Sequence, residues 1–192
     1  IEPLSLDELI ARRAEMLKAY QNAAYADLYE ARVARVRAAE SNLKLGEQLT
    51  RAAATYLSKL MAYKDEYEVA RLYTRPEYKQ AVEDTFGKGT KLTFLMAPPL
   101  LSKKNNRGEL IKQNFGPWMM TAFKVLKQFK WLRSKGLDPF GWTDERKMER
   151  KLRDEYLDRL EKLARELSVD NHALAVEIAN IPDEIRGYGH VK

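Results

Sequence analysis

The pattern of apolar and polar positions predicts helices along most of the chain. Apolar residues recur every three or four positions in six segments, which is the period of a helix with one packed face. Ser5 with Glu8 forms a capping box before the first segment, and Thr143 caps a strongly amphipathic one. We therefore expect a mainly α protein, a bundle of five to seven helices. The predicted segments are 5–40, 47–73, 74–87, 116–136, 143–167 and 170–186.

The first predicted helix carries two apolar stripes on nearly opposite sides. One stripe runs from Leu6 through Leu17 to Leu28, and the other comprises Tyr25, Tyr29, Val33 and Val36. A helix that contacts a single core needs only one stripe. The second half of this helix is therefore expected to lie between two partners. We assign contacts with another domain to Tyr25, Tyr29, Val33, Val36 and Tyr188; the alternative, burial of Tyr25 and Tyr29 within this chain, stays open.

The second predicted helix contains tyrosines at helical spacing among many charges. Tyr63 and Tyr67 share a face with Leu57, Leu60, Met61 and Ala70, and the opposite face is charged. For these two tyrosines we favour burial in the core of this chain over a docking role. Gly87 is expected to end the short helix that follows.

The period changes to that of a β-strand after residue 90. An apolar and aromatic run at 91–96 is followed by two prolines, a basic loop at 102–108 and a second extended run ending at Phe115. This predicts one antiparallel hairpin over about residues 90–115. Pro117 then opens a helix whose Phe123, Leu126 and Phe129 are expected in the core. Phe140 and Trp142 are expected to close the edge of that core.

Composition narrows the class of protein. The 192 residues suit one domain, and we assign 1–192 as a single accessory domain. The chain has 34 Lys and Arg against 28 Asp and Glu, a net charge of +6 that permits an acidic partner without requiring one. It has no cysteine, which excludes disulfides, cysteinyl zinc sites and iron–sulfur clusters within it and fits a cytoplasmic protein. No apolar run is long enough to cross a bilayer. The start at Ile1 suggests a piece of a longer chain.

No arrangement of residues predicts catalysis or metal binding. The two histidines, His172 and His190, stand apart from any nucleophile, and no spacing of ligands is typical of a metal site. The glycines at Phe86–Gly89 follow a helix and precede a strand, the reverse of a phosphate-binding loop. We assign no catalytic residue, no metal and no cofactor to this chain.

One helix has a composition that suits nucleic acid. Basic residues interleaved with aromatic ones can bind single strands, but lysines at such spacing are also the ordinary solvated side of a helix. We favour the second interpretation. The residues are Lys124, Lys127, Lys130, Arg133 and Lys135, with Phe129 and Trp131.

Several long segments resemble the C-terminal domain of the fused indolepyruvate ferredoxin oxidoreductases, a family of 2-oxoacid:ferredoxin oxidoreductases. The resemblance runs through nearly the whole chain in order. Leu95 departs from it, because a histidine is expected at that position. The segments are KLMAYKDEYEVARLY at 59–73, MAPPLL at 96–101, FGPWM at 115–119, LDPFGWT at 137–143 with Glu145-Arg146 and Glu149-Arg150, and IRGYGHVK at 185–192.

The resemblance implies a parent enzyme that oxidatively decarboxylates arylpyruvates to acyl-coenzyme A and passes electrons to ferredoxin. Thiamine diphosphate with magnesium and 4Fe–4S clusters would do this chemistry in a homodimer of the parent. The present chain has neither cysteines nor a Gly-Asp-Gly segment for the diphosphate. We therefore expect a non-catalytic domain that contacts the other domains of the parent.

A second expectation assigns this chain a share in binding coenzyme A. Arginine and lysine recognise phosphate well, and basic residues gather near the C-terminus and in the loop of the hairpin. An independent module that binds nucleic acid is a third and weaker alternative. The candidate phosphate contacts are Arg186, His190 and Lys192, with Lys103, Lys104 and Arg107.

Overall fold

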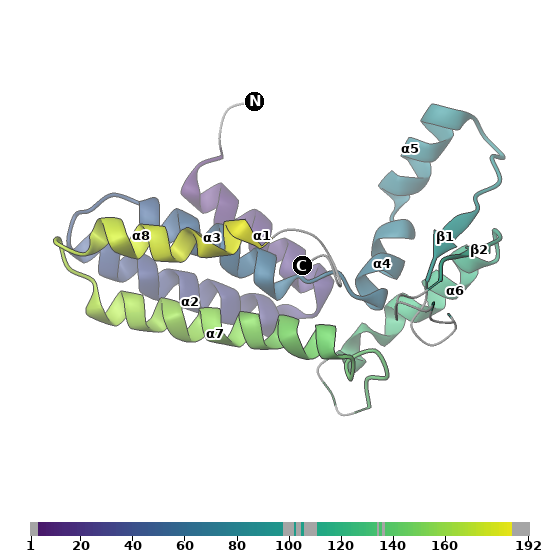
Figure 1. Ribbon diagram of the computed structural model, residues 1–192. Coiled ribbons are helices and arrows are strands. Elements are labelled where there is room, and N and C mark those ends of the chain that lie inside the picture. Colours follow the sequence, from purple (N-terminus) through teal and green to yellow (C-terminus); the bar gives the residue numbers. More distant parts are fainter. Residues whose placement is uncertain are drawn as a thin grey trace. The chain divides into compact units, whose positions relative to one another are not determined.

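The computed structural model describes residues 4–97, 102, 105, 111–133, 135 and 137–185. Within these residues the chain forms eight α-helices, two short 3-10 helices and one two-stranded antiparallel sheet (Figure 1). The prediction of a mainly α fold with one small hairpin is confirmed. We expected a single domain over 1–192. The chain divides into two compact units, Ile1–Tyr63 with Trp142–Lys192 and Lys64–Gly141, and each is described by itself below.

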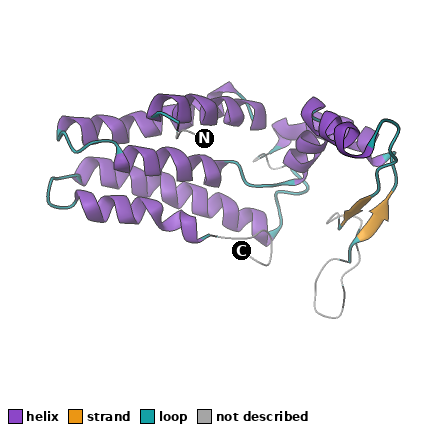
Figure 2. Cartoon of the chain, turned by 90° about the horizontal axis from the view of Figure 1, so that it is seen from above, coloured by secondary structure: helices purple, strands orange, loops and turns teal. Residues whose placement is uncertain are grey.

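The first unit is a bundle of five α-helices, in which four helices pack around α3. Its helices are α1 (Leu6–Tyr20), α2 (Ala23–Asn42), α3 (Gln48–Met61), α7 (Asp144–Glu166) and α8 (His172–Asn180), with the 3-10 helix η2 (Ile181–Glu184) after α8. Helix α3 contacts each of the other four, and Figure 2 shows these helices running alongside one another. Leu17, Val33, Leu57 and Leu160 are fully buried among them. The apolar periodicity therefore encloses one contiguous core in this unit.

The segment predicted as the first helix forms two helices, α1 and α2. The two apolar stripes arose from treating these two helices as one. Asn22 interrupts the segment because its side chain accepts a hydrogen bond from the backbone N–H of Tyr25 at 2.9 Å and caps α2. In α2 the side chains of Val33 and Val36 are fully buried, whereas Leu28 is exposed. The prediction of one helix with two apolar sides over residues 5–40 is therefore wrong. Each of the two helices has a single buried side.

The second predicted helix is also divided. Helix α3 ends at Met61, and α4 (Glu66–Tyr73) begins after Asp65, which accepts a hydrogen bond from the N–H of Glu68 at 2.8 Å. The predicted burial is confirmed for Leu57, Leu60, Met61, Tyr63, Tyr67 and Ala70. The break separates these residues between the two units, because Lys64 begins the second one.

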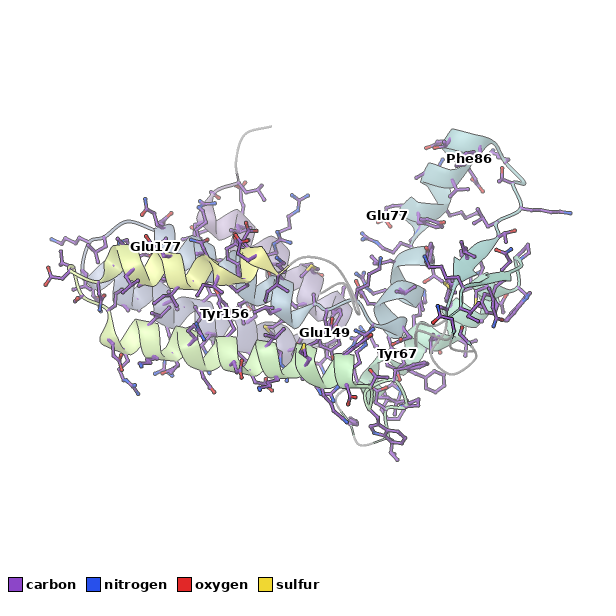
Figure 3. The ribbon with its side chains drawn as sticks, viewed as in Figure 1. Tyr67, Glu77, Phe86, Glu149, Tyr156 and Glu177 are labelled. Carbon is purple, nitrogen blue, oxygen red and sulfur yellow. The ribbon has the colours of Figure 1, made fainter. Side chains whose placement is uncertain are left out.

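Tyrosine hydroxyls satisfy carbonyl groups at and near the end of α3. Tyr20 donates to the carbonyl of Tyr63 at 2.9 Å, and Tyr25 donates to the carbonyl of Met61 at 2.9 Å. Carbonyls in the last turn of a helix have no partner within it, so a buried helix end needs such donors. Tyr156, labelled in Figure 3, serves α8 in the same way by donating to Ala179 at 2.8 Å. The rings of Tyr20 and Tyr156 are buried and that of Tyr25 is half-buried, and all three hydroxyls are hydrogen-bonded.

Glu40 joins three helices of the first unit. Its carboxylate is fully buried at the N-terminus of α3, where it accepts from the N–H groups of Leu49 and Thr50 at 2.8 and 2.9 Å. The hydroxyl of Thr50 donates to it at 2.6 Å, and the Nε2 atom of His172 lies 2.7 Å from it. Burial raises the pKa of Glu40. The hydrogen bonds from Thr50, His172 and the backbone together lower it by more than burial raises it, so the net shift of this pKa is downward.

The second unit combines three α-helices and a 3-10 helix with the hairpin. Its elements are α4, α5 (Pro76–Phe86), β1 (Phe94–Met96), β2 (Gln113–Phe115), α6 (Met119–Leu126) and the 3-10 helix η1 (Lys127–Leu132). Phe94 pairs with Phe115 across the strands, and Tyr73 stacks on Phe123 with ring centres 5.4 Å apart. Ala70, Phe94, Met119 and Phe123 form the buried core of this unit. Phe86, at the end of α5 in Figure 3, is exposed, and Gly87 ends the helix as predicted with a φ of 88°.

We predict that Glu40→Gln lowers the stability of the first unit by about 1.5–3 kcal/mol, the range for hydrogen bonds to a charged group. The amide keeps one acceptor oxygen but brings an N–H₂ group toward the donors of Leu49 and Thr50. Because the pKa of Glu40 is lowered in the folded state, its contribution is present above the ordinary value of 4.5 and is lost as the pH falls through the folded value.

Thermal unfolding as a function of pH checks this prediction. The wild type should lose stability below about pH 4.5, and Glu40→Gln should lose less over the same interval. Glu30→Gln is the matched control, because Glu30 lies on the same helix and is exposed. Equal stability of the two variants at neutral pH would contradict the role given to Glu40.

Candidate functional site: an apolar and basic face on the second unit

Helix α6 has one apolar side in the core and a second apolar side in solvent. Met119 and Phe123 are buried, as predicted for Phe123. Trp118 and Val125, seven residues apart and therefore on one side of a helix, are 60% and 54% exposed. The exposed rings of Phe129 and Trp131 follow in η1, at 42% and 53%. The prediction that Phe129 lies in the core is therefore wrong.

The charged residues of the segment that carries these exposed side chains are all basic. Between Ile111 and Leu137 the sequence has five Lys, one Arg and no Asp or Glu. Lys124 and Lys135 are exposed, and Lys127 is half-buried. The Nζ atom of Lys135 lies 5.0 Å from the ring centre of Trp131, within reach of a cation–π contact. We call Trp118, Val125, Phe129 and Trp131, with Lys124 and Lys135, the α6–η1 face.

Arg133, one of the five basic residues considered for nucleic-acid binding, is buried. Its Nη2 atom donates to Oδ1 of Asp65 at 2.8 Å, and its Nε atom donates to Oδ2 of the same carboxylate. Burial, and then the charges of Arg133 and Arg71, lower the pKa of Lys130. The five residues thus do not form one solvated basic row, as the sequence suggested, and this weakens the nucleic-acid alternative.

The Asp65–Arg133 pair organises the second unit. Asp65 caps α4 through Glu68 and holds Arg133 at the end of η1, so one carboxylate fixes both elements. Tyr67, labelled in Figure 3, lies under the guanidinium with its ring centre 5.6 Å away. Its hydroxyl donates to the buried Asp138 at 2.9 Å. Burial, and then the hydrogen bond to Asp138, raise the pKa of Tyr67, so this hydroxyl stays protonated and donating.

The turn after η1 is held by Asp138. Its Oδ1 atom also accepts from the N–H of Phe140 at 3.1 Å, and Phe140 packs edge-on against Tyr67. A Cβ atom at Gly141 would come within 2.8 Å of the Asp138 carboxylate, so the turn requires glycine there. Phe140 therefore packs as predicted. Trp142, which we expected beside it, is exposed.

The Glu40, Thr50 and His172 cluster contains the residue types of a catalytic triad in an order unsuited to nucleophilic catalysis. A triad needs the hydroxyl hydrogen-bonded to the histidine, which removes its proton. Here the hydroxyl of Thr50 and the ring of His172 both contact the carboxylate of Glu40, which lies between them. The carboxylate also binds two backbone N–H groups. The arrangement caps a helix and does not activate a nucleophile.

The first unit also has a surface groove. A groove of about 600 Å³ runs between α7 and α8, where Leu163, Leu174 and Ile178 are rimmed by both acidic and basic side chains. Among the described residues, no three His, Asp or Glu side chains are grouped so that they could hold a metal ion. None of the helices in this part of the chain is both long and apolar enough to span a bilayer.

The residues assigned to contacts with another domain lie in two kinds of position. Tyr29, Val33 and Val36 are fully buried in the bundle, so they expose no area to a second domain. Tyr25 is half-buried, with its hydroxyl on Met61. These positions favour the alternative, in which the residues belong to the core of this chain. The remaining candidates, Tyr188, Arg186, His190, Lys192, Lys103, Lys104 and Arg107, lie outside the described residues.

A comparison with known families finds a match along nearly the whole chain. A family model matches residues 6–192, and its description is a family of unknown function, DUF6537. The chain belongs to the DUF6537 family. No curated protein and no solved structure shows significant similarity to it.

For this DUF6537 chain we predict that Arg133→Met destabilises the second unit by about 3–5 kcal/mol, because the variant leaves Asp65 buried beside an apolar side chain. Chemical denaturation followed by helical circular dichroism measures the loss. Arg75→Met is the control, since Arg75 forms an ion pair with Glu77 in solvent, where such a pair contributes little to stability. Similar losses in both variants would contradict a structural role for the buried pair.

Proposed function

We propose that this chain is a non-catalytic C-terminal structural and interaction domain of a cytoplasmic indolepyruvate ferredoxin oxidoreductase. The α6–η1 face is the observation that carries the interaction role. It exposes four large apolar side chains along α6 and η1, although the same helix already contributes Met119 and Phe123 to a core. Exposed apolar patches with aromatic residues are typical of surfaces that bind another protein.

The charged groups of the two units support a structural role for the rest of the molecule. Glu40 is used to cap α3, and Asp65 is used to cap α4 and to hold Arg133. Glu149, labelled in Figure 3, is buried and pairs with Arg146 on the same helix. Glu40 and Asp65 thus connect elements of this chain through hydrogen bonds to their oxygens, and Glu149 is paired within α7.

In this proposal the redox and carbon chemistry belongs to other parts of the parent enzyme. The donor set of the chain does not fit its cofactors, because it has no cysteine for an iron–sulfur cluster and no Gly-Asp-Gly segment for thiamine diphosphate. The parent would convert arylpyruvates to acyl-coenzyme A with ferredoxin as electron acceptor. The resemblance of five sequence segments to that family supports the assignment of the parent.

We predict that the 192-residue chain binds the remainder of such an oxidoreductase and has no turnover of indolepyruvate by itself. Mixing the two purified proteins should give a complex in size-exclusion chromatography with light scattering, with a dissociation constant in the range of about 1 µM or tighter. Absence of a complex at about 100 µM, or arylpyruvate oxidation by the isolated chain, would refute the proposal.

A further inference from the structure

We propose that the α6–η1 face docks an acidic amphipathic helix of a protein partner. The inference deepens the proposed function and rests on it only for the identity of that partner. The occupant is defined by two properties of the face, its apolar side chains at helical spacing and the single sign of its charges.

The spacing of the exposed residues favours a helix as the occupant. Trp118, Ala122 and Val125 follow one another at intervals of four and three residues, which is the interval of a seam between two packed helices. Ala122 is half-buried between two larger exposed side chains. A small residue between large ones leaves a depression into which a side chain of the partner can pack.

The charges favour an acidic partner. Lys124 lies beside the seam of Trp118 and Val125, whereas Lys127, two residues after Val125, projects from nearly the opposite side of the helix. Lys135 extends over the ring of Trp131. The segment from Ile111 to Leu137 has no carboxylate that could pair with a basic partner. A helix that places Glu or Asp beside its apolar seam would meet Lys124 and Lys135 as its apolar side covers Val125 and Trp131.

The same observations favour protein over nucleic acid. Arg133 is buried with Asp65, so its guanidinium faces a carboxylate of this chain and not solvent. Trp118 packs against Phe115 and Trp131 against the ammonium of Lys135, so neither ring stands alone as a platform for a base. An apolar seam with Lys124 and Lys135 beside it matches the buried centre and charged rim of a helix–helix contact.

Tryptophan fluorescence gives a direct measurement. The chain has three tryptophans, and Trp142→Phe leaves Trp118 and Trp131, both on the face. The probe is a designed helix of about 21 residues, three heptads, with leucine in the seam and glutamate beside it. Its twin carries lysine in place of glutamate. Single-stranded oligothymidylate and vesicles of phosphatidylcholine with phosphatidylserine are the two other probes.

The acidic helix should shift the emission to shorter wavelength and bind at least about tenfold more tightly than its lysine twin at low salt, with the difference shrinking as salt is added. Val125→Glu should weaken binding at least about tenfold by placing a like charge in the seam. Val169→Glu is the matched control, because Val169 is 64% exposed on the first unit and Val125 is 54% exposed. It should leave binding unchanged.

Charge reversal by Lys124→Glu with Lys135→Glu supplies a second test that does not alter an apolar side chain. It should invert the preference between the two peptides. Equal binding of the twins, or equal effects of Val125→Glu and Val169→Glu, would overturn the inference. Binding of the oligonucleotide or the vesicles that depends on Val125, without a preference for the acidic peptide, would overturn it as well.

The failure of this inference and that of the proposed function are distinguishable. If the acidic helix binds and the remainder of the oxidoreductase does not, the inference stands and the proposed parent is wrong. If the remainder of the oxidoreductase binds Val125→Glu as tightly as the wild type, the proposed function stands and the α6–η1 face is not its docking surface.

Discussion

The need to satisfy buried helix ends determines how both units are assembled. The first N–H groups and the last carbonyls of a helix have no partners within it, and water cannot reach them in a core. Helix α3 lies at the centre of its bundle, so both of its ends meet side chains from other helices. Glu40 binds the N–H groups of Leu49 and Thr50 at one end, and the hydroxyls of Tyr20 and Tyr25 bind carbonyls at the other. The contacts that satisfy α3 also hold α1 and α2 against it.

The second unit solves the same problem with one residue. Asp65 caps α4 and receives the guanidinium of Arg133, which lies directly after η1. The fully buried apolar core of this unit is small, and the pair adds hydrogen bonds that fix the ends of α4 and η1. The position of the α6–η1 face follows from it, because η1 leads directly into Arg133.

The sequence predicted the helical class, the hairpin and most buried positions, because these follow from periodicity. It did not predict the breaks at Asn22 and Asp65, since the spacing of apolar residues can continue across the cap that separates two helices. Asn22 and the Asp65-x-x-Glu68 spacing were signals of caps that could have been recognised. The partners of Asp65 and Glu40 were beyond reach, since Arg133 and His172 lie 68 and 132 residues further along the chain. Only the fold brings them together.

Helix α2, the second half of the first predicted helix, does lie between partners, because it contacts α1, α3 and α7. Two apolar sides on one helix, one of them in solvent, are found in α6. In α1 and α2 the stripes were produced by joining two helices across a break. In α6 the buried Met119 and Phe123 and the exposed Trp118 and Val125 occupy one continuous helix. The buried side fixes the helix before any partner arrives, so little conformational freedom remains to be lost when the exposed side is covered. A seam held in this way can bind through a small area, and its affinity then depends on how well Asp65 and Arg133 keep η1 in place.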